Sequence, residues 1–106
     1  MALTCSFWDH VKARTKSDPA FRAALLGEAV QAFLAGDLDT AKAALRDFVN
    51  AIIGFAALAK ATRIPPKSLM RMFGPNGNPT AAHLSEVIRV LQKKTGVHLE
   101  VRASVA

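Results

Sequence analysis

The chain has 106 residues, of which 51% are hydrophobic and 21% are charged. This balance is typical of a single globular domain with one core, and it excludes an intrinsically disordered chain. The longest apolar runs, such as residues 56–59, are far shorter than the roughly 18 residues that a membrane-spanning helix needs. A single cysteine, Cys5, excludes an intramolecular disulfide framework. Charged residues interrupt the first apolar stretch, so we expect no secretory leader, no membrane contact and a cytoplasmic location.

The net charge of +6 comes entirely from the second part of the chain. Residues 1–59 carry six basic and six acidic side chains, whereas residues 60–106 carry eight basic and two acidic ones. A positive region on a neutral support is typical of a protein that binds a polyanion. Charge by itself leaves four alternatives open: DNA, RNA, an acidic lipid surface, and a solvated basic surface without a ligand.

Three helices are predicted in the first half of the chain. Ser6 is expected to cap the first, over residues 7–15. The second begins at Pro19, directly after the capping residue Asp18, and extends to about residue 35. Its apolar face is so broad that we expect other elements to cover it from two directions. A third helix is predicted over residues 38–53, where apolar residues recur at helical spacing. We interpret these helices as a scaffold or partner surface, with no site of chemistry.

The next two predicted helices are much shorter and follow each other closely. Residues 55–62 form the first, with Leu58 facing inward and the small Ala59 placed where a second helix crosses closely. A turn of three residues follows, and Pro66 is suited to the first position of the next helix, which ends near Phe73. This succession of short helix, turn and short helix predicts a helix-turn-helix unit.

The second of these short helices has a cationic and an apolar side. At roughly 100° per residue, Lys67, Ser68 and Arg71 fall on one side. Leu69, Met72 and Phe73 fall on the opposite side, and Met70 lies on the border. A recognition helix presents long hydrogen-bond donors to the DNA major groove while its reverse side packs on the domain. We therefore predict that Lys67, Ser68 and Arg71 contact bases; the alternative is that they form only the solvated face of an amphipathic helix.

A cluster of turn residues, 74–79, precedes a last helix that ends near Lys94 and is capped by Asn78 or Thr80. Loop N–H groups beside a helix N-terminus favour phosphate binding. The alternative is a connector exposed to solvent. The candidate DNA-phosphate contacts are Lys60, Arg63, Asn76, Asn78, Thr80 and Lys94.

Residues 97–102 alternate between apolar and polar side chains, as a half-buried strand does. A lone strand leaves its backbone groups unpaired, so it requires a neighbour. We expect Val97, Leu99 and Val101 to contact the same strand of a second subunit or the sheet edge of a protein partner. The alternative is an extended tail packed on its own domain, for example against residues 3–5.

Several segments of the chain are similar to the HigA-like addiction-module antidote family. They are Leu58-Ala59-Lys60-Ala61-Thr62, residues 67–72, Gly77-Asn78-Pro79-Thr80 and residues 97–101. The resemblance covers roughly residues 19–102. It implies one all-α domain, a lambda repressor-like helix-turn-helix bundle over residues 54–96 with a helical extension at residues 1–53 and the terminal strand at 97–102. It also implies a homodimer that binds double-stranded operator DNA, represses its own operon and neutralises a RelE-like ribonuclease toxin.

Arg63 departs from the usual helix-turn-helix pattern, because the turn favours glycine at this position. A non-glycine residue with a positive φ costs on the order of 1 kcal/mol. We therefore expect either a locally different turn or a role for Arg63 in phosphate contact.

No catalytic or metal site is predicted. His10, His83 and His98 lack metal-ligand spacing, Cys5 has no basic neighbour in sequence, and no P-loop occurs. We therefore expect neither an enzyme nor a cofactor. The main alternative to a DNA-binding regulator is a protein–protein interaction module with the same helical fold. Within the DNA-binding class, a regulator without a toxin is a further alternative.

Overall fold

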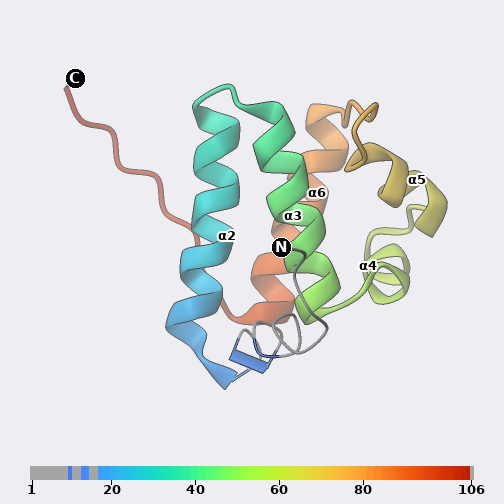
Figure 1. The fold of residues 1–106 in the computed structure, drawn as a ribbon, viewed down its shortest axis with the longest axis horizontal. Coiled ribbons are helices and arrows are strands. Elements are labelled where there is room, and N and C mark those ends of the chain that lie inside the picture. Colours follow the sequence, from blue (N-terminus) through green and yellow to red (C-terminus); the bar gives the residue numbers. More distant parts are fainter. Residues whose placement is uncertain (1–9, 11–12, 15–16, 106) are drawn as a thin grey trace, which may run out of the picture.

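The computed structural model describes residues 10, 13–14 and 17–105. Over these residues the protein is all-helical, as predicted, and contains no strand. The helices are α2 (Pro19–Leu34), α3 (Leu38–Ile52), α4 (Phe55–Thr62), α5 (Pro66–Met72) and α6 (Ala81–Thr95). Figure 1 shows α2 and α3 as an antiparallel pair, with α6 behind them and with α4 and α5 together at one end. Of the helix predicted at residues 7–15, His10, Ala13 and Arg14 are helical, and the remainder lies outside the described residues.

Side-chain caps begin three of these helices. Asp18 Oδ1 accepts hydrogen bonds from the backbone N–H groups of Ala20 and Phe21, at 3.1 and 3.2 Å, and Pro19 follows as predicted. Asp37 caps α3 in the same way. At the start of α6, Thr80 Oγ1 accepts from the N–H of His83 at 3.1 Å, so Thr80 is the cap and Asn78 is not. Each cap satisfies N–H groups that the helix cannot pair internally.

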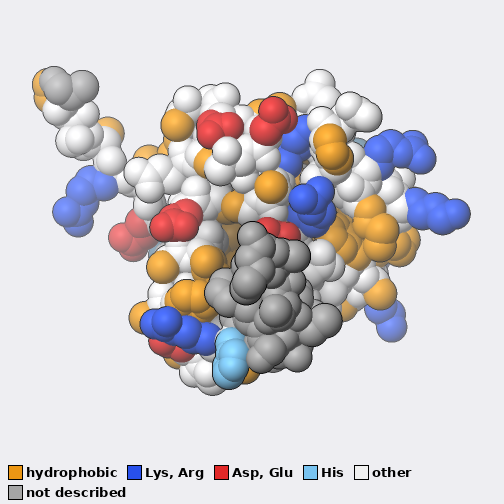
Figure 2. Space-filling view, in the orientation of Figure 1, with side chains coloured by type: hydrophobic (Ala, Val, Ile, Leu, Met, Phe, Trp, Pro, Cys, Tyr) orange, Lys and Arg blue, Asp and Glu red, His pale blue; other side chains and the backbone are white. Residues whose placement is uncertain are grey.

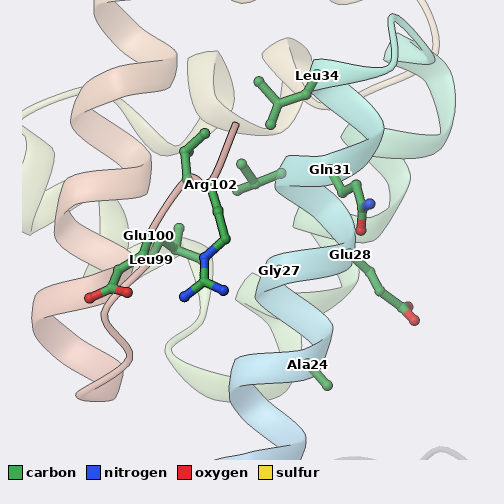
Figure 3. A pocket seen from close by; sticks show the side chains of 10 residues that line it. Ala24, Gly27, Glu28, Gln31, Leu34, Leu99, Glu100 and Arg102 are labelled. Atoms are coloured by element: carbon green, nitrogen blue, oxygen red, sulfur yellow. The ribbon is translucent and has the colours of Figure 1, made fainter. Parts of the chain in front are cut away.

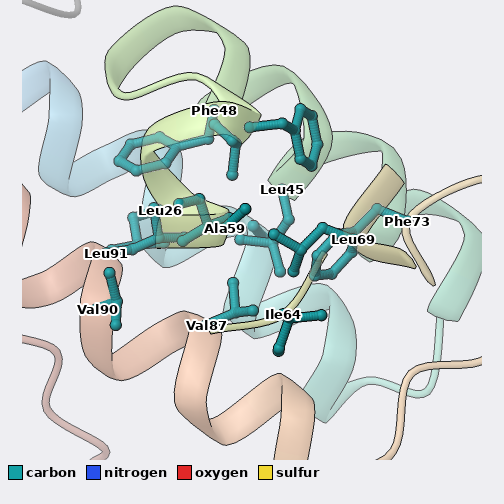
Figure 4. Close-up of a cluster of buried hydrophobic side chains, with 14 of the residues drawn as sticks. Leu26, Leu45, Phe48, Ala59, Ile64, Leu69, Phe73, Val87, Val90 and Leu91 are labelled. Atoms are coloured by element: carbon teal, nitrogen blue, oxygen red, sulfur yellow. The ribbon is translucent and has the colours of Figure 1, made fainter. Parts of the chain in front are cut away.

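The core lies where the helices meet, and every helix contributes to it (Figure 4). Leu58 and Ala59 are buried, as predicted, and α4 packs against both α5 and α6. On α5, Leu69 and Phe73 are almost fully buried. Because these two side chains are anchored in the core, the opposite side of α5 has to face outward. The labelled members of the cluster in Figure 4 are Leu26, Leu45, Phe48, Ala59, Ile64, Leu69, Phe73, Val87, Val90 and Leu91.

The C-terminal segment is extended but unpaired in the single chain. Val97 is buried and Leu99 packs against the core, and the Leu99 N–H donates to Gln92 Oε1 at 2.9 Å. Val101, in contrast, is 78% exposed. The start of the segment therefore behaves as a tail packed on its own domain. The strand predicted at residues 97–102 is not formed, because no neighbouring strand is present to pair with it; residues 3–5 lie outside the described residues.

Candidate nucleic-acid interface

The turn between α4 and α5 is held in a left-handed conformation at Arg63. Its φ and ψ are 61° and 24°, and its N–H donates to Ala59 O at 2.8 Å. Among the described non-glycine residues, Arg63 alone has a positive φ. The next residue, Ile64, is buried, and its N–H donates to the Thr62 hydroxyl at 3.4 Å. Hydrogen bonds of Arg63 and Ile64 and the burial of Ile64 therefore fix the turn, and Arg63 adopts the left-handed conformation that favours glycine.

Helix α5 exposes the side that carries its two cations. Lys67 and Arg71 are exposed, whereas Ser68 is only half-buried and lies at the edge of this face. Met70, placed on the border by helical geometry, is 52% exposed and belongs to the outward face. The predicted base-contacting residues are thus brought together on one helix, with Lys67, Met70 and Arg71 at the centre of the face.

The surface around α4 and α5 is positive. Residues 55–80 include four basic residues and no acidic residue. The four are Lys60, Arg63, Lys67 and Arg71, and each is exposed. None of them takes part in an ion pair within the described part of the chain. Figure 2 shows Lys and Arg side chains around the end where α4 and α5 lie, while most acidic side chains in this view lie over α2 and α3. Unpaired cations on one surface attract a polyanion.

A buried lysine of the scaffold holds the loop that follows α5. Lys42, on α3, is 4% exposed, and its Nζ donates to Gly77 O at 2.7 Å and to Pro75 O at 3.3 Å. Arg46, one turn further along α3, donates from Nη1 to Phe73 O at 3.4 Å. Nothing local in the sequence marks these partners, which lie more than 25 residues away. Their hydrogen bonds draw three loop carbonyls toward α3.

Gly77 allows this loop to lie against the end of α5. A Cβ atom at Gly77 would lie 2.0 Å from the carbonyl oxygen of Arg71 and 2.4 Å from that of Met72. No side chain fits at such distances from a backbone. The turn is closed by the N–H of Gly77, which donates to Gly74 O at 3.0 Å. The sequence signalled a turn cluster here but not this close approach.

Apart from Lys60 and Arg63, the predicted phosphate contacts divide into two groups. Asn76, Asn78 and Thr80 are exposed in the loop and at the start of α6, and the Thr80 hydroxyl is engaged in capping. Lys94 lies at the other end of α6, about 20 Å away at 1.5 Å per residue. There it lines a shallow depression with Arg22, Ile52 and Thr95. The fold therefore does not place Lys94 on the α4–α5 surface.

The Glu86–Arg89 pair of α6 and the three histidines do not form a second candidate site among the described residues. Arg89 donates two hydrogen bonds to Glu86, at 2.6 and 3.2 Å, and these bonds lower the pKa of the Glu86 carboxyl and raise that of Arg89. His10, His83 and His98 are all exposed. Within the described ranges, no three metal-ligating side chains come together. None of the helices described here is long and apolar enough to cross a membrane.

The site thus consists of an outward α5 face with two cations, two further cations on α4 and its turn, and a loop fixed to α3. Comparison of the whole chain with protein-family models, with curated proteins and with solved structures finds no match.

Proposed function

We propose that this protein is a sequence-specific DNA-binding repressor in which α4, the turn and α5 form a helix-turn-helix unit. The observation that carries the proposal is the division of α5: Lys67 and Arg71 are exposed, whereas Leu69 and Phe73 are anchored in the core. A recognition helix needs this division, because its outer side enters the major groove while its inner side fixes the docking angle.

Each cation has a role that follows from its position. Arg71 offers a planar, two-pronged donor to guanine O6 and N7, and Lys67 offers a single donor to guanine or to phosphate. Met70, beside Lys67 on the exposed face, supplies the apolar contact that a thymine methyl group accepts. Lys60 and Arg63, on α4 and the turn, contact phosphates and set the register of the unit on the duplex.

The test is a titration of duplex DNA from upstream of the protein's own gene with the protein, with fluorescence anisotropy as the readout of binding. We expect tighter binding to this duplex than to a scrambled duplex of the same length. Arg71→Ala should weaken binding by about 1–3 kcal/mol and relax the preference for the cognate duplex. Lys94→Ala is the matched control, since it removes a cation outside the α4–α5 surface, and affinity should remain unchanged. If Arg71→Ala and Lys94→Ala both lowered DNA affinity by the same amount for every sequence, Arg71 would not be a base-contacting residue.

The regulatory role follows from the resemblance to addiction-module antidotes. We propose that the protein acts as an antitoxin, which represses its own operon and neutralises a RelE-like ribonuclease. A reporter gene behind its own promoter should be repressed by the wild-type protein and released by Arg71→Ala. Co-expression with the product of the adjacent open reading frame should yield a stable complex and restore growth if that product is toxic. If the protein repressed its promoter but the product of the adjacent open reading frame were not toxic, the antitoxin role would be refuted and the protein would be a regulator without a toxin. Absence of any duplex binding would favour the protein–protein interaction module instead.

A further inference from the structure

Helix α2 is apolar on nearly all sides, and the described residues leave part of it open. Its sixteen residues include only two charged side chains, Arg22 and Glu28. Helix α3 packs along one side, where Leu26 and Ala29 are fully buried. On the other side Leu34 is 69% exposed. A helix that is apolar all round is normally buried, so the open side of α2 calls for a cover that the described residues do not provide.

A groove runs along this open side. It has a volume of about 500 Å³, and Figure 3 shows its two walls. One wall is α2 from Ala24 to Leu34, where Gly27 and Val30 add small and apolar surface. The other wall is the C-terminal tail over residues 99–102. The charged residues that line the groove are Glu28 on α2 and Glu100 and Arg102 on the tail.

The C-terminal tail has the alternating pattern of an amphipathic strand, and only its first half is covered. Apolar residues occupy every second position from Val97 to Val105. Val97 and Leu99 reach the core, but Val101 is 78% exposed and Val105 is 100% exposed. Among the hydrogen bonds of the described residues, none involves the backbone of residues 100–105. The second half therefore has no apolar surface to pack against and no backbone hydrogen-bond partner.

We propose that residues 101–105 of one chain lie in the α2 groove of a second copy, and that the second copy returns the same contact. Val101, Ala103 and Val105 would then cover the apolar side of the partner's α2. Arg102 would lie near Glu28 of the partner subunit. Two identical chains that make the same contact with each other in both directions form a closed, two-fold symmetric dimer.

The dimensions and the backbone of the groove suit this occupant. The α2 wall from Ala24 to Leu34 is about 15 Å long at 1.5 Å per residue. A strand from residue 101 to residue 105 spans about 13 Å at 3.3 Å per step. The other wall is itself an unpaired extended segment, and two copies of one segment related by a two-fold axis run antiparallel. The incoming tail can therefore form backbone hydrogen bonds with that wall while its side chains rest on α2.

This interface does not rest on the proposed DNA binding. Figure 1 places α2 and the tail on the opposite side of the molecule from α4 and α5. Loss of the dimer and loss of the α5 contacts can therefore be measured separately, by mass and by DNA titration.

The first experiment measures molar mass by light scattering during size-exclusion chromatography. We expect the full chain to have the mass of two chains. Leu34→Asp and a chain that ends at Glu100 should each have the mass of one chain, with an unchanged helical circular-dichroism spectrum. Met70→Ser is the matched control, because it removes another exposed apolar side chain away from the groove, and it should remain a dimer. The proposal would be overturned if the full-length protein were a monomer, or if both Leu34→Asp and the chain that ends at Glu100 still formed a dimer.

The second experiment asks whether the tail enters its own groove or that of another copy. In a Cys5→Ser background, one variant carries Gln31→Cys in the groove and another carries Ala103→Cys in the tail. After the two are mixed, a short bismaleimide should link one variant to the other in high yield. The tail variant mixed with a Lys93→Cys variant is the control and should give little product. Cross-linking only within a chain that carries both Gln31→Cys and Ala103→Cys would show that each tail covers its own groove, which contradicts exchange.

Discussion

Arg63 combines an exposed positive charge with a backbone conformation that favours glycine. Its φ of 61° costs an L-residue roughly 1–2 kcal/mol. The surrounding hydrogen bonds of Thr62 and Ile64 hold it there. Strained residues that a fold maintains in this way tend to occur at functional sites. The sequence identified the position as unusual but left the conformation open, because local propensity alone favoured a relaxed turn.

Two substitutions separate the strain at Arg63 from its charge. Arg63→Gly relieves the strain, so the free energy of unfolding should rise by up to about 1 kcal/mol, after the added entropy of glycine in the unfolded chain is subtracted. Arg63→Ala keeps the strain, so stability should not rise. Both variants lose the proposed phosphate contact, and the salt slope of DNA binding should fall by about one in each. Urea unfolding and DNA titration measure the two effects, and a glycine variant less stable than the alanine variant would contradict the strain.

Lys42 is the residue whose role was least visible in the sequence. Nothing local in the sequence marks its partners, yet its ammonium group is buried against the carbonyls of Pro75 and Gly77. Lys42→Met removes the donor and leaves these acceptors without it, so the free energy of unfolding should fall by about 1–3 kcal/mol. Lys60→Met, at an exposed site, should change it by less than about 0.5 kcal/mol. Equal effects in urea unfolding would mean that the buried hydrogen bonds contribute nothing.

At the scale of elements, the helices were predictable because their signals are local. Capping residues and apolar periodicity gave the bounds of α2 to α6 within a few residues, and α4 was predicted at Phe55–Thr62 as observed. The outward side of α5 followed from angular spacing alone. The position of Met70 and the attachment of the loop to α3 could not be predicted, since they depend on which neighbours pack against each element. The C-terminal segment has a strand pattern, but a pattern cannot supply the second strand.

The junction between α5 and its loop is tested by a pair of glycine substitutions. Gly77→Ala forces a Cβ against the carbonyl of Arg71, and either the loop or α5 must shift. Overpacking of this kind costs typically about 1–3 kcal/mol, and, on the proposed role of α5 in base contact, DNA affinity should fall with it. At Gly74 the nearest atoms are 3.4 Å from the added Cβ, so Gly74→Ala should be milder in thermal unfolding and in DNA titration. A reversed order of the two variants would contradict the close approach.

At the scale of the whole molecule, part of the charge imbalance in the sequence corresponds to a division in space. The neutral helices α2 and α3 form one side and the four unpaired cations of residues 55–80 lie on the other. Composition could predict a positive region but not that the α2 groove and the α5 face would lie on opposite sides. The proposed dimer contact and the proposed DNA contact therefore lie on separate sides.

Salt dependence tests the positive surface as a unit. Each phosphate neutralised by a cation lowers the slope of log affinity against log salt by about 0.9 for duplex DNA. Four exposed cations therefore predict a slope of up to about −4 per chain. Anisotropy titrations at several salt concentrations give this number. An affinity independent of salt would exclude phosphate contact through these residues.

The exposed tail also makes the lone protomer easy to cut. Proteases cleave extended, unpaired chain more readily than helices, and Arg102 lies in such a segment whereas Arg89, Lys93 and Lys94 lie within α6. Trypsin should therefore cleave after Arg102 before it cleaves within α6, and cleavage should be faster in dilute protein, where a tail has no second copy to shelter it. The cellular lifetime of the chain would then depend on its own abundance, with scarce copies clipped first.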